Sequence, residues 1–222
     1  MNISIKKHFA HFSDKVFFHS FLFSILLLIV SLFVNYYASL YATKMASASV
    51  TDIVLSNIRV YDVTNIFVYG PWIFWIFLAV VTMFKPYRIP FMVKNIALFV
   101  LIRSFFITLT HIGPFPTTAA IDSTRLITDF TSGGDLFFSA HTGLPFLMAL
   151  VFWKDEILRY VLLATSVFFG AVVLMGHLHY TIDVVAAFFI TYSIYCLAEQ
   201  FFRKDLEYFH QIPTKDKTQE ML

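Results

Sequence analysis

The sequence predicts an all-α, polytopic membrane protein, a six-transmembrane-helix bundle with both termini in the cytoplasm. Composition gives the first indication: of 222 residues, 59% are apolar and only 14% are charged, and the mean hydropathy is +0.74, above that of an average soluble domain. The apolar residues also fall into runs close to the roughly 20 residues that cross a bilayer. Finally, the basic residues gather in alternate connecting segments.

The apolar runs are expected to be helices, because lipid offers the main chain no outside hydrogen-bond partner. The first run carries no formal charge from Val16 to Val34, which is longer than a signal-peptide core, so we expect it to be a retained span. The chain is predicted to be a single membrane domain over residues 1–222, ending in a polar cytoplasmic tail at 203–222. Spans are predicted at about residues 16–42, 67–84, 90–110, 136–153, 157–175 and 181–202.

The Lys and Arg residues predict the orientation of these spans. Six spans place both termini on one side, and the segments on that side hold twelve Lys and Arg residues against three on the other, Lys44, Arg59 and Arg125. Since positive charge is retained in the cytoplasm, we expect cytoplasmic termini and a location in the cell membrane.

Charge and cysteine content exclude several classes of partner. A net charge of +2, spread over short loops, gives no reason to expect nucleic acid binding. The single cysteine, Cys196, has no partner for an intramolecular disulfide or a cysteine metal pair. No cofactor is predicted.

Four ionisable residues lie within or at the edge of predicted spans, close to their outer ends. His141 is about five residues inside the fourth span and Arg103 about seven inside the third, roughly 8 Å and 10 Å deep at the helical rise. His179 and Asp183 open the sixth span. Intramembrane charge is costly and usually marks a functional site or a structural ion pair, so we expect these residues to converge.

The spacing of His179 and Asp183 indicates a chemical role. Residues four apart lie on one face of a helix, so the carboxylate can accept the Nδ1 proton of the imidazole and leave Nε2 able to attack. This pattern is typical of an oriented histidine nucleophile.

Two motifs carry a family resemblance: "GGDLFFSAHT" (Gly133–Thr142) and "HYTIDVVAAFFI" (His179–Ile190). They resemble motifs of the sphingomyelin synthases, a branch of the type 2 phosphatidic acid phosphatase superfamily. A further segment, "RSFFITLTHIGPFP" (Arg103–Pro116), is similar to the arginine-bearing segment of that branch. Ala140 stands where the motif usually has glycine. The basic phosphate-binding signatures of the wider superfamily are not found in this sequence, and the sphingomyelin synthase branch also lacks them in that form.

The resemblance implies a role for each residue of this cluster. His179 would be the nucleophile, Asp183 its orienting carboxylate and His141 the second catalytic histidine. Arg103 is the first candidate for binding substrate phosphate, because a guanidinium can hold two oxygens, and Arg125 is the reserve. A structural ion pair of Arg103, for example with Asp135, stays open as the alternative.

The predicted function is that of an integral-membrane lipid phosphatase or phospho-head-group transferase. It would act on a phospholipid at the outer, extracytoplasmic leaflet through a phosphohistidine intermediate, without a metal. Water as acceptor gives a phosphatase and a lipid hydroxyl gives a transferase, and both stay open. The sequence predicts no oligomeric state.

Two other readings compete with this one. A zinc site formed by His177 and His179 with His141 and Asp183 is less favoured, because a metal on His179 would occupy the attacking nitrogen; His177 and His111 are expected to be solvated histidines at the interface. A small membrane transporter or a His-ligated haem or metal protein would also place histidine and arginine at one depth. The Gly and Pro residues do not interrupt paired spans as a transporter would require.

Overall fold

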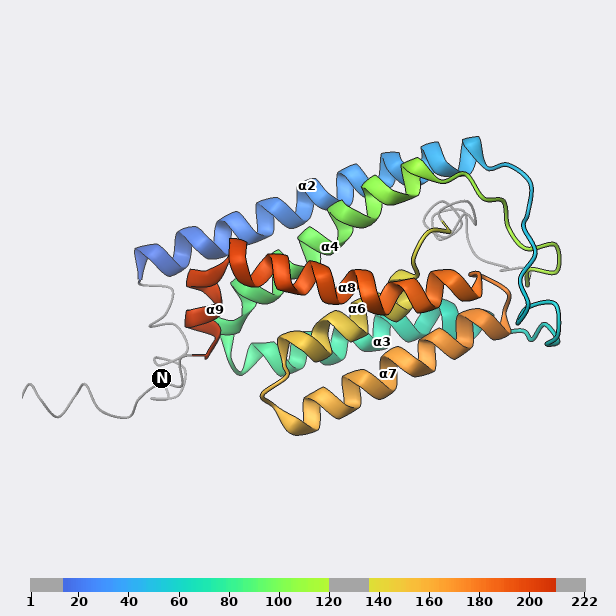
Figure 1. The fold of residues 1–222 in the computed structure, drawn as a ribbon. Helices are drawn as coiled ribbons and strands as arrows, with labels where there is room; N and C mark the ends of the chain where they lie inside the picture. Colours follow the sequence, from blue (N-terminus) through green and yellow to red (C-terminus); the bar gives the residue numbers. More distant parts are fainter. Residues whose placement is uncertain (1–13, 120–135, 211–222) are drawn as a thin grey trace, which may run out of the picture.

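The computed structural model describes residues 14–119 and 136–210, and within them every regular element is helical. The helices are α2 (Lys15–Met45), α3 (Thr64–Met83), the short 3-10 helix η2 (Pro86–Arg88), α4 (Ile89–Leu109), α6 (Ala140–Val151), α7 (Glu156–Met175), α8 (Thr181–Phe201) and α9 (Arg203–His210). They form one elongated bundle (Figure 1).

Five helices of the described chain are long and apolar enough to cross a membrane: α2, α3, α4 with η2, α7 and α8. The ends of α2, α3, α4, α7 and α8 lie within three residues of the predicted spans. The prediction of a fourth span over 136–153 differs from the structure, since α6 has only 12 residues, or about 18 Å of helix. Residues 136–139 are not helical, and Phe138 adopts a positive φ of 26°. Such main chain is tolerated at membrane depth where protein buries it.

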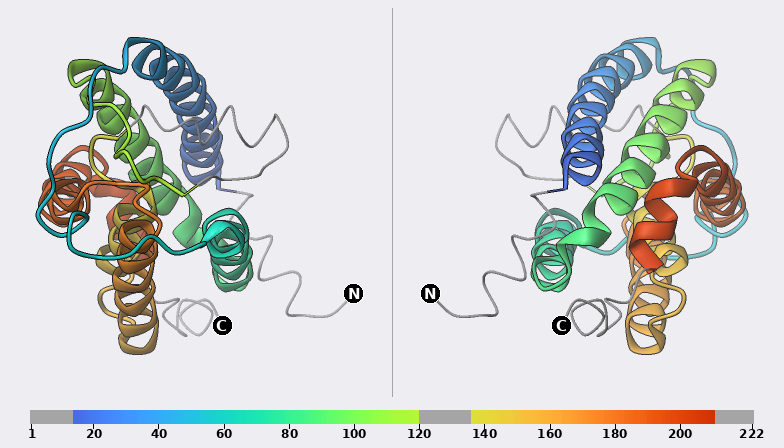
Figure 2. Two further views of the ribbon diagram at one scale, coloured as in Figure 1. Left: turned by 90° about the vertical axis from the view of Figure 1, so that its right-hand side faces the viewer. Right: turned by 90° about the vertical axis from the view of Figure 1, so that its left-hand side faces the viewer.

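The helix α2 lies at the periphery beside α4 (Figure 2). Apart from Phe17, the buried residues of α2 are small, namely Ser24, Ser31, Ala38, Ser39 and Ala42, which lets the two helix axes approach. The buried hydroxyls of Ser24 and Ser31 donate to carbonyls of their own helix at 2.7 Å. The opposite face of α2 exposes large apolar side chains, as expected for contact with lipid.

The hydrophobic core is formed mainly by side chains of α4, α6 and α8. Phe99, Leu147 and Met148 are fully buried there. Gly143 of α6 allows this packing, because a Cβ atom at that position would lie 2.7 Å from the Phe99 ring and 2.9 Å from the Thr191 hydroxyl. The short helix α6 is therefore enclosed by protein, which explains why it can start in the bundle interior.

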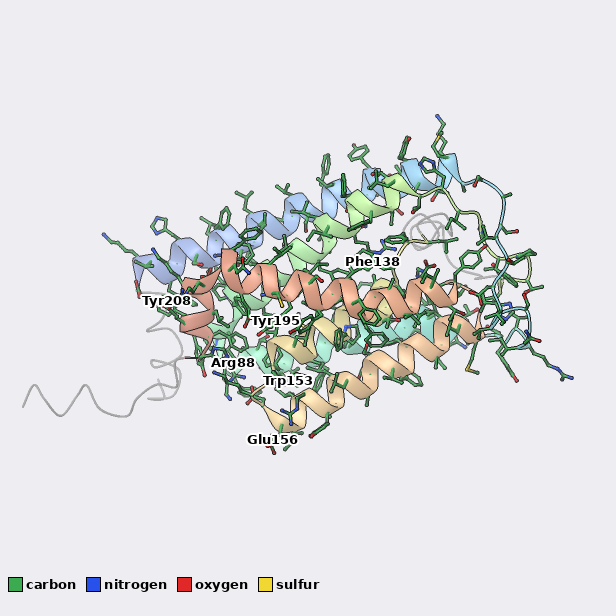
Figure 3. The ribbon with its side chains drawn as sticks, in the orientation of Figure 1. Arg88, Phe138, Trp153, Glu156, Tyr195 and Tyr208 are labelled. Atoms are coloured by element: carbon green, nitrogen blue, oxygen red, sulfur yellow. The ribbon has the colours of Figure 1, made fainter. Side chains whose placement is uncertain are left out.

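The two ends of the bundle differ. One end, here called the loop end, carries residues 46–63, 110–119 and 176–180, together with the N-terminal ends of α3 and α8 (Figure 1). The opposite end, here called the α9 end, carries α9, η2 and the starts of α2 and α7. Arg88, Trp153, Glu156 and Tyr208 lie at the α9 end, and Phe138 lies nearer the loop end (Figure 3).

The two ends of the described chain meet at the α9 end, where the Tyr208 hydroxyl donates to Asp14 at 3.3 Å. That this end faces the cytoplasm stays a prediction from the Lys and Arg count. Residues 203–210, expected to begin a polar tail, form α9 and pack against the bundle. Phe209 is buried against the rings of Phe91 and Phe152, with centroids 5.6 and 5.4 Å away.

A buried ion pair joins α9 to α4. The Lys94 ammonium donates to Asp205 at 2.6 Å and to the Ser20 hydroxyl at 2.7 Å, and Ser20 in turn donates to Asp205. This triad connects α2, α4 and α9 at the end of the bundle farthest from the loop end.

Candidate active site

The start of α8 presents the histidine and carboxylate singled out by their spacing. His179 lies two residues before the helix and Asp183 in its first turn, and both side chains are buried. The His179 Nδ1 atom is 3.3 Å from Asp183 Oδ2. The same oxygen accepts the main-chain N–H of Tyr180 at 3.0 Å. Asp183 thus orients the imidazole through Nδ1 and holds the turn that leads into the helix.

The start of α6 is attached to this turn and to α4. The Ser139 N–H donates to the main-chain carbonyl of Asp183 at 3.1 Å, and Arg103 Nε donates to the carbonyl of Phe138 at 3.2 Å. Arg103 is buried. The positive φ of Phe138 turns the chain so that its carbonyl meets the guanidinium. The two sequence motifs and the arginine-bearing segment are therefore joined by hydrogen bonds.

His141 lies in the first turn of α6. The predicted span, which began at residue 136, had placed it in the second turn of a longer helix. Its ring stacks on Phe67 with centroids 4.2 Å apart and contacts Phe169 edge-on at 6.1 Å. It follows Phe138 by three residues and Ser139 by two, and these residues bond through their main chains to Arg103 and to Asp183. The structure thus brings His141, His179, Asp183 and Arg103 into one neighbourhood near the loop end.

A cavity of about 100 Å³ adjoins His141 between α3, α6 and α7. Apart from His141, its lining is apolar or aromatic: Pro71, Phe74, Trp75, Ala140, Leu144, Pro145 and Phe169. The imidazole therefore borders a space suited to hydrocarbon.

Asp52 also belongs to this region, although no sequence pattern pointed to it. Its carboxylate accepts the Thr181 N–H at 2.7 Å and the Thr181 hydroxyl at 2.8 Å, so it caps α8 from the loop between α2 and α3. Burial raises the pKa of Asp52, but hydrogen bonds from Thr181 and the nearby main chain outweigh it, and the net pKa is lowered. Asp52 and Thr181 are 129 positions apart in the sequence, so no local sequence pattern predicts their contact.

His177 is buried, so the expectation of a solvated interfacial histidine was wrong for this residue. Its Nδ1 atom lies 2.7 Å from the Thr117 hydroxyl, and its carbonyl accepts the Thr118 hydroxyl at 3.2 Å. It has a positive φ of 52°. The reason for the burial is that residues 115–119 fold over the end of α7, a contact between two loops that a span-by-span reading does not include. His111 is partly buried, with its ring edge-on to Tyr41.

Two of the predicted positions fall in the segment between residues 119 and 136. Arg125, the reserve phosphate ligand, and Asp135, the alternative partner of Arg103, lie outside the described residues. Within residues 14–119 and 136–210, no three His, Cys, Asp or Glu side chains are grouped closely enough to hold a metal ion.

Comparison with known proteins gives one result that bears on this site. Residues 132–200 match the family described as "PAP2 superfamily C-terminal", and this segment contains His141, His179 and Asp183. Neither the curated proteins nor the solved structures provide a match. The family match does not distinguish the sphingomyelin synthase branch. The matched segment covers 69 of the 222 residues and is similar to a superfamily whose members are generally phosphatases or phosphotransferases.

Proposed function

We propose that the protein is an integral-membrane lipid phosphatase or phospho-head-group transferase that works through a phosphohistidine at His179. The observation that carries the proposal is the Nδ1 contact of His179 with Asp183 in the neighbourhood of His141 and Arg103, within the segment that matches the PAP2 superfamily. The apolar cavity beside His141 favours a lipid as the phosphate ester.

The first step forms a bond between His179 Nε2 and phosphorus and breaks the bond from phosphorus to the lipid oxygen. Asp183 holds the Nδ1 proton and stabilises the cationic ring, in the manner of an oriented base. Protonated His141 gives its proton to the departing oxygen. Arg103 supplies a permanent positive charge for the phosphoryl oxygens.

The second step reverses these roles. Neutral His141 removes a proton from water or from a lipid hydroxyl, whose oxygen attacks phosphorus while the bond to His179 breaks. A covalent intermediate replaces one difficult displacement by two easier ones. The chemistry is the same for both acceptors, so the protein is a phosphatase or a transferase according to which acceptor reaches the site.

The start of α6 is the better place for the phosphate. The first amides of α8 are already used, since Tyr180 N–H donates to Asp183 and Thr181 N–H donates to Asp52. A helix N-terminus favours anions, and α6 begins next to His141. The Ser139 hydroxyl at this start is fully buried and has no hydrogen-bond partner among the described residues, so it can serve a phosphate oxygen.

The test is turnover of labelled phospholipid by purified protein in micelles, with and without ceramide or diacylglycerol. Free phosphate, free phospho-head-group and a new head-group lipid are distinct products and identify the acceptor. His179→Ala is expected to lower kcat by about 10³-fold or more, and Asp183→Asn by about 10² to 10⁴-fold. The matched control is His19→Gln, at an exposed position four residues after the start of α2, which should keep wild-type turnover. Full activity of the folded His179→Ala protein would refute the scheme.

A further inference from the structure

The imidazole of His179 is not oriented by helix geometry alone. His179 and Asp183 are four residues apart, but α8 begins only at Thr181, so the turn through Tyr180 and Thr181 decides where the ring lies. Within a helix the same spacing would fix both side chains on one face. Here the turn needs other restraints.

Three hydrogen-bonded restraints hold this turn. Asp183 accepts the Tyr180 N–H. The Tyr180 hydroxyl donates to the carbonyl of Gly113 at 2.8 Å and accepts the Val50 N–H at 3.2 Å. Asp52 accepts both the N–H and the hydroxyl of Thr181. Only the last of these contacts brings a further negative charge to the start of α8.

The Asp52 carboxylate is itself held in place. Its Oδ1 atom accepts the N–H groups of Val54 at 2.9 Å and Leu55 at 3.1 Å, in addition to the Thr181 hydroxyl, while Oδ2 accepts the Thr181 N–H. Asp52 is 9% exposed, and Leu55 packs against Tyr180 in a buried cluster. Hydrogen bonds to ionised, partly buried groups are among the stronger ones in proteins, and a carboxylate complements the positive end of a helix.

We propose that Asp52 is a positioning residue for the reaction, fixing the start of α8 so that His179 Nε2 is aimed at phosphorus. The inference rests on the proposed function. Asp52 reaches Thr181 and does not contact His179, so it acts through the turn. It is expected to affect kcat and to leave KM nearly unchanged, because the cavity beside His141 does not include it.

The variants separate this role from a general effect on folding. Asp52→Asn keeps the size of the side chain. If the amide oxygen of Asn keeps the contacts of Oδ1, the NH₂ group takes the place of Oδ2 and faces the Thr181 N–H, so that two donors oppose each other. Thr181→Val removes the hydroxyl and keeps the N–H, and Thr181→Ser restores the hydroxyl. Asp62→Asn is the matched control, since Asp62 lies in the same loop and caps α3 by accepting the Thr64 N–H at 3.0 Å, a task that Asn performs equally well.

The measurement is kcat and KM for the labelled phospholipid on monodisperse protein in micelles, with His179→Ala as the inactive reference. Asp52→Asn is expected to lower kcat about 10- to 100-fold with KM within about threefold. Thr181→Val should lower kcat by a smaller factor, about 3- to 10-fold, while Thr181→Ser and Asp62→Asn stay within about twofold of wild type.

The outcomes are separable. Wild-type kcat in folded Asp52→Asn, with His179→Ala inactive, overturns the positioning role and leaves the proposed function intact. An active His179→Ala protein overturns the proposed function itself. If Asp52→Asn aggregates, the Thr181 pair decides: low kcat for Val with recovery by Ser supports the role, and wild-type kcat for Val overturns it.

Discussion

Removing the carboxylate of Asp205 in α9 is expected to destabilise the bundle at the end opposite the candidate site. Lys94 is 5% exposed, and its ammonium has two acceptors, Asp205 at 2.6 Å and Ser20 at 2.7 Å. In Asp205→Ala only the neutral hydroxyl would remain. Breaking a buried pair by removing one partner costs about 3–5 kcal/mol, because the other charge stays buried.

The lower end of this range applies here, because the pair lies near the end of the bundle and Asp205 keeps about a tenth of its side chain exposed. A cost of about 3 kcal/mol corresponds to a factor of more than about 100 in the unfolding equilibrium. The assay is reversible unfolding in mixed micelles with increasing denaturing detergent, combined with hydrogen exchange of the amides in α9.

Two controls make the prediction specific to the buried charge. Glu207→Gln lies in the same helix, but its pair with Arg203 is 3.7 Å apart and largely exposed, so the change should be at most about 1 kcal/mol. The double variant Lys94→Met with Asp205→Leu removes both charges and should recover most of the stability. Stability of Asp205→Ala within about 0.5 kcal/mol of wild type would refute the reasoning.

Two further predictions concern packing and pH. Gly143→Ala is expected to destabilise the protein by about 1–3 kcal/mol, because the new Cβ would lie 2.7 Å from Phe99 and 2.9 Å from Thr191; thermal unfolding in detergent measures this, and an unchanged midpoint would contradict the packing. Burial, followed by nearby basic side chains, lowers the pKa of His210 in α9. The neutral ring therefore contributes stability at pH values above the usual histidine pKa of about 6.5. That contribution is lost as the pH falls below this value, because the unfolded chain then binds the proton more readily than the folded one. The protection factors of the α9 amides, which correct for the intrinsic pH dependence of exchange, should therefore fall between pH 7.5 and 5, and His210→Gln should reduce this fall. Wild-type protection factors that do not change with pH would contradict the prediction.

Hydropathy was enough to predict most of the bundle, because crossing a bilayer requires a run of apolar residues of nearly fixed length. The ends of α2, α3, α4, α7 and α8 follow from those runs. The same criterion fails for α6. The run 136–153 contains no Asp, Glu, Lys or Arg, but its first four residues make hydrogen bonds and contacts to α4 and α8 instead of forming part of a helix. Apolar character identifies what avoids water, and it does not distinguish contact with lipid from contact with protein.

The residues of the candidate site divide in the same way. The sequence by itself was enough to select His141, His179, Asp183 and Arg103 as candidates, since ionisable groups in apolar runs stand out and the spacing of His179 and Asp183 is local. Only the tertiary structure decided that Asp52 caps α8, that residues 115–119 bury His177, and that α9 pairs with Lys94. Each of these contacts joins segments far apart in the chain, and their hydrogen bonds depend on where the helices end, which no local pattern of residues records.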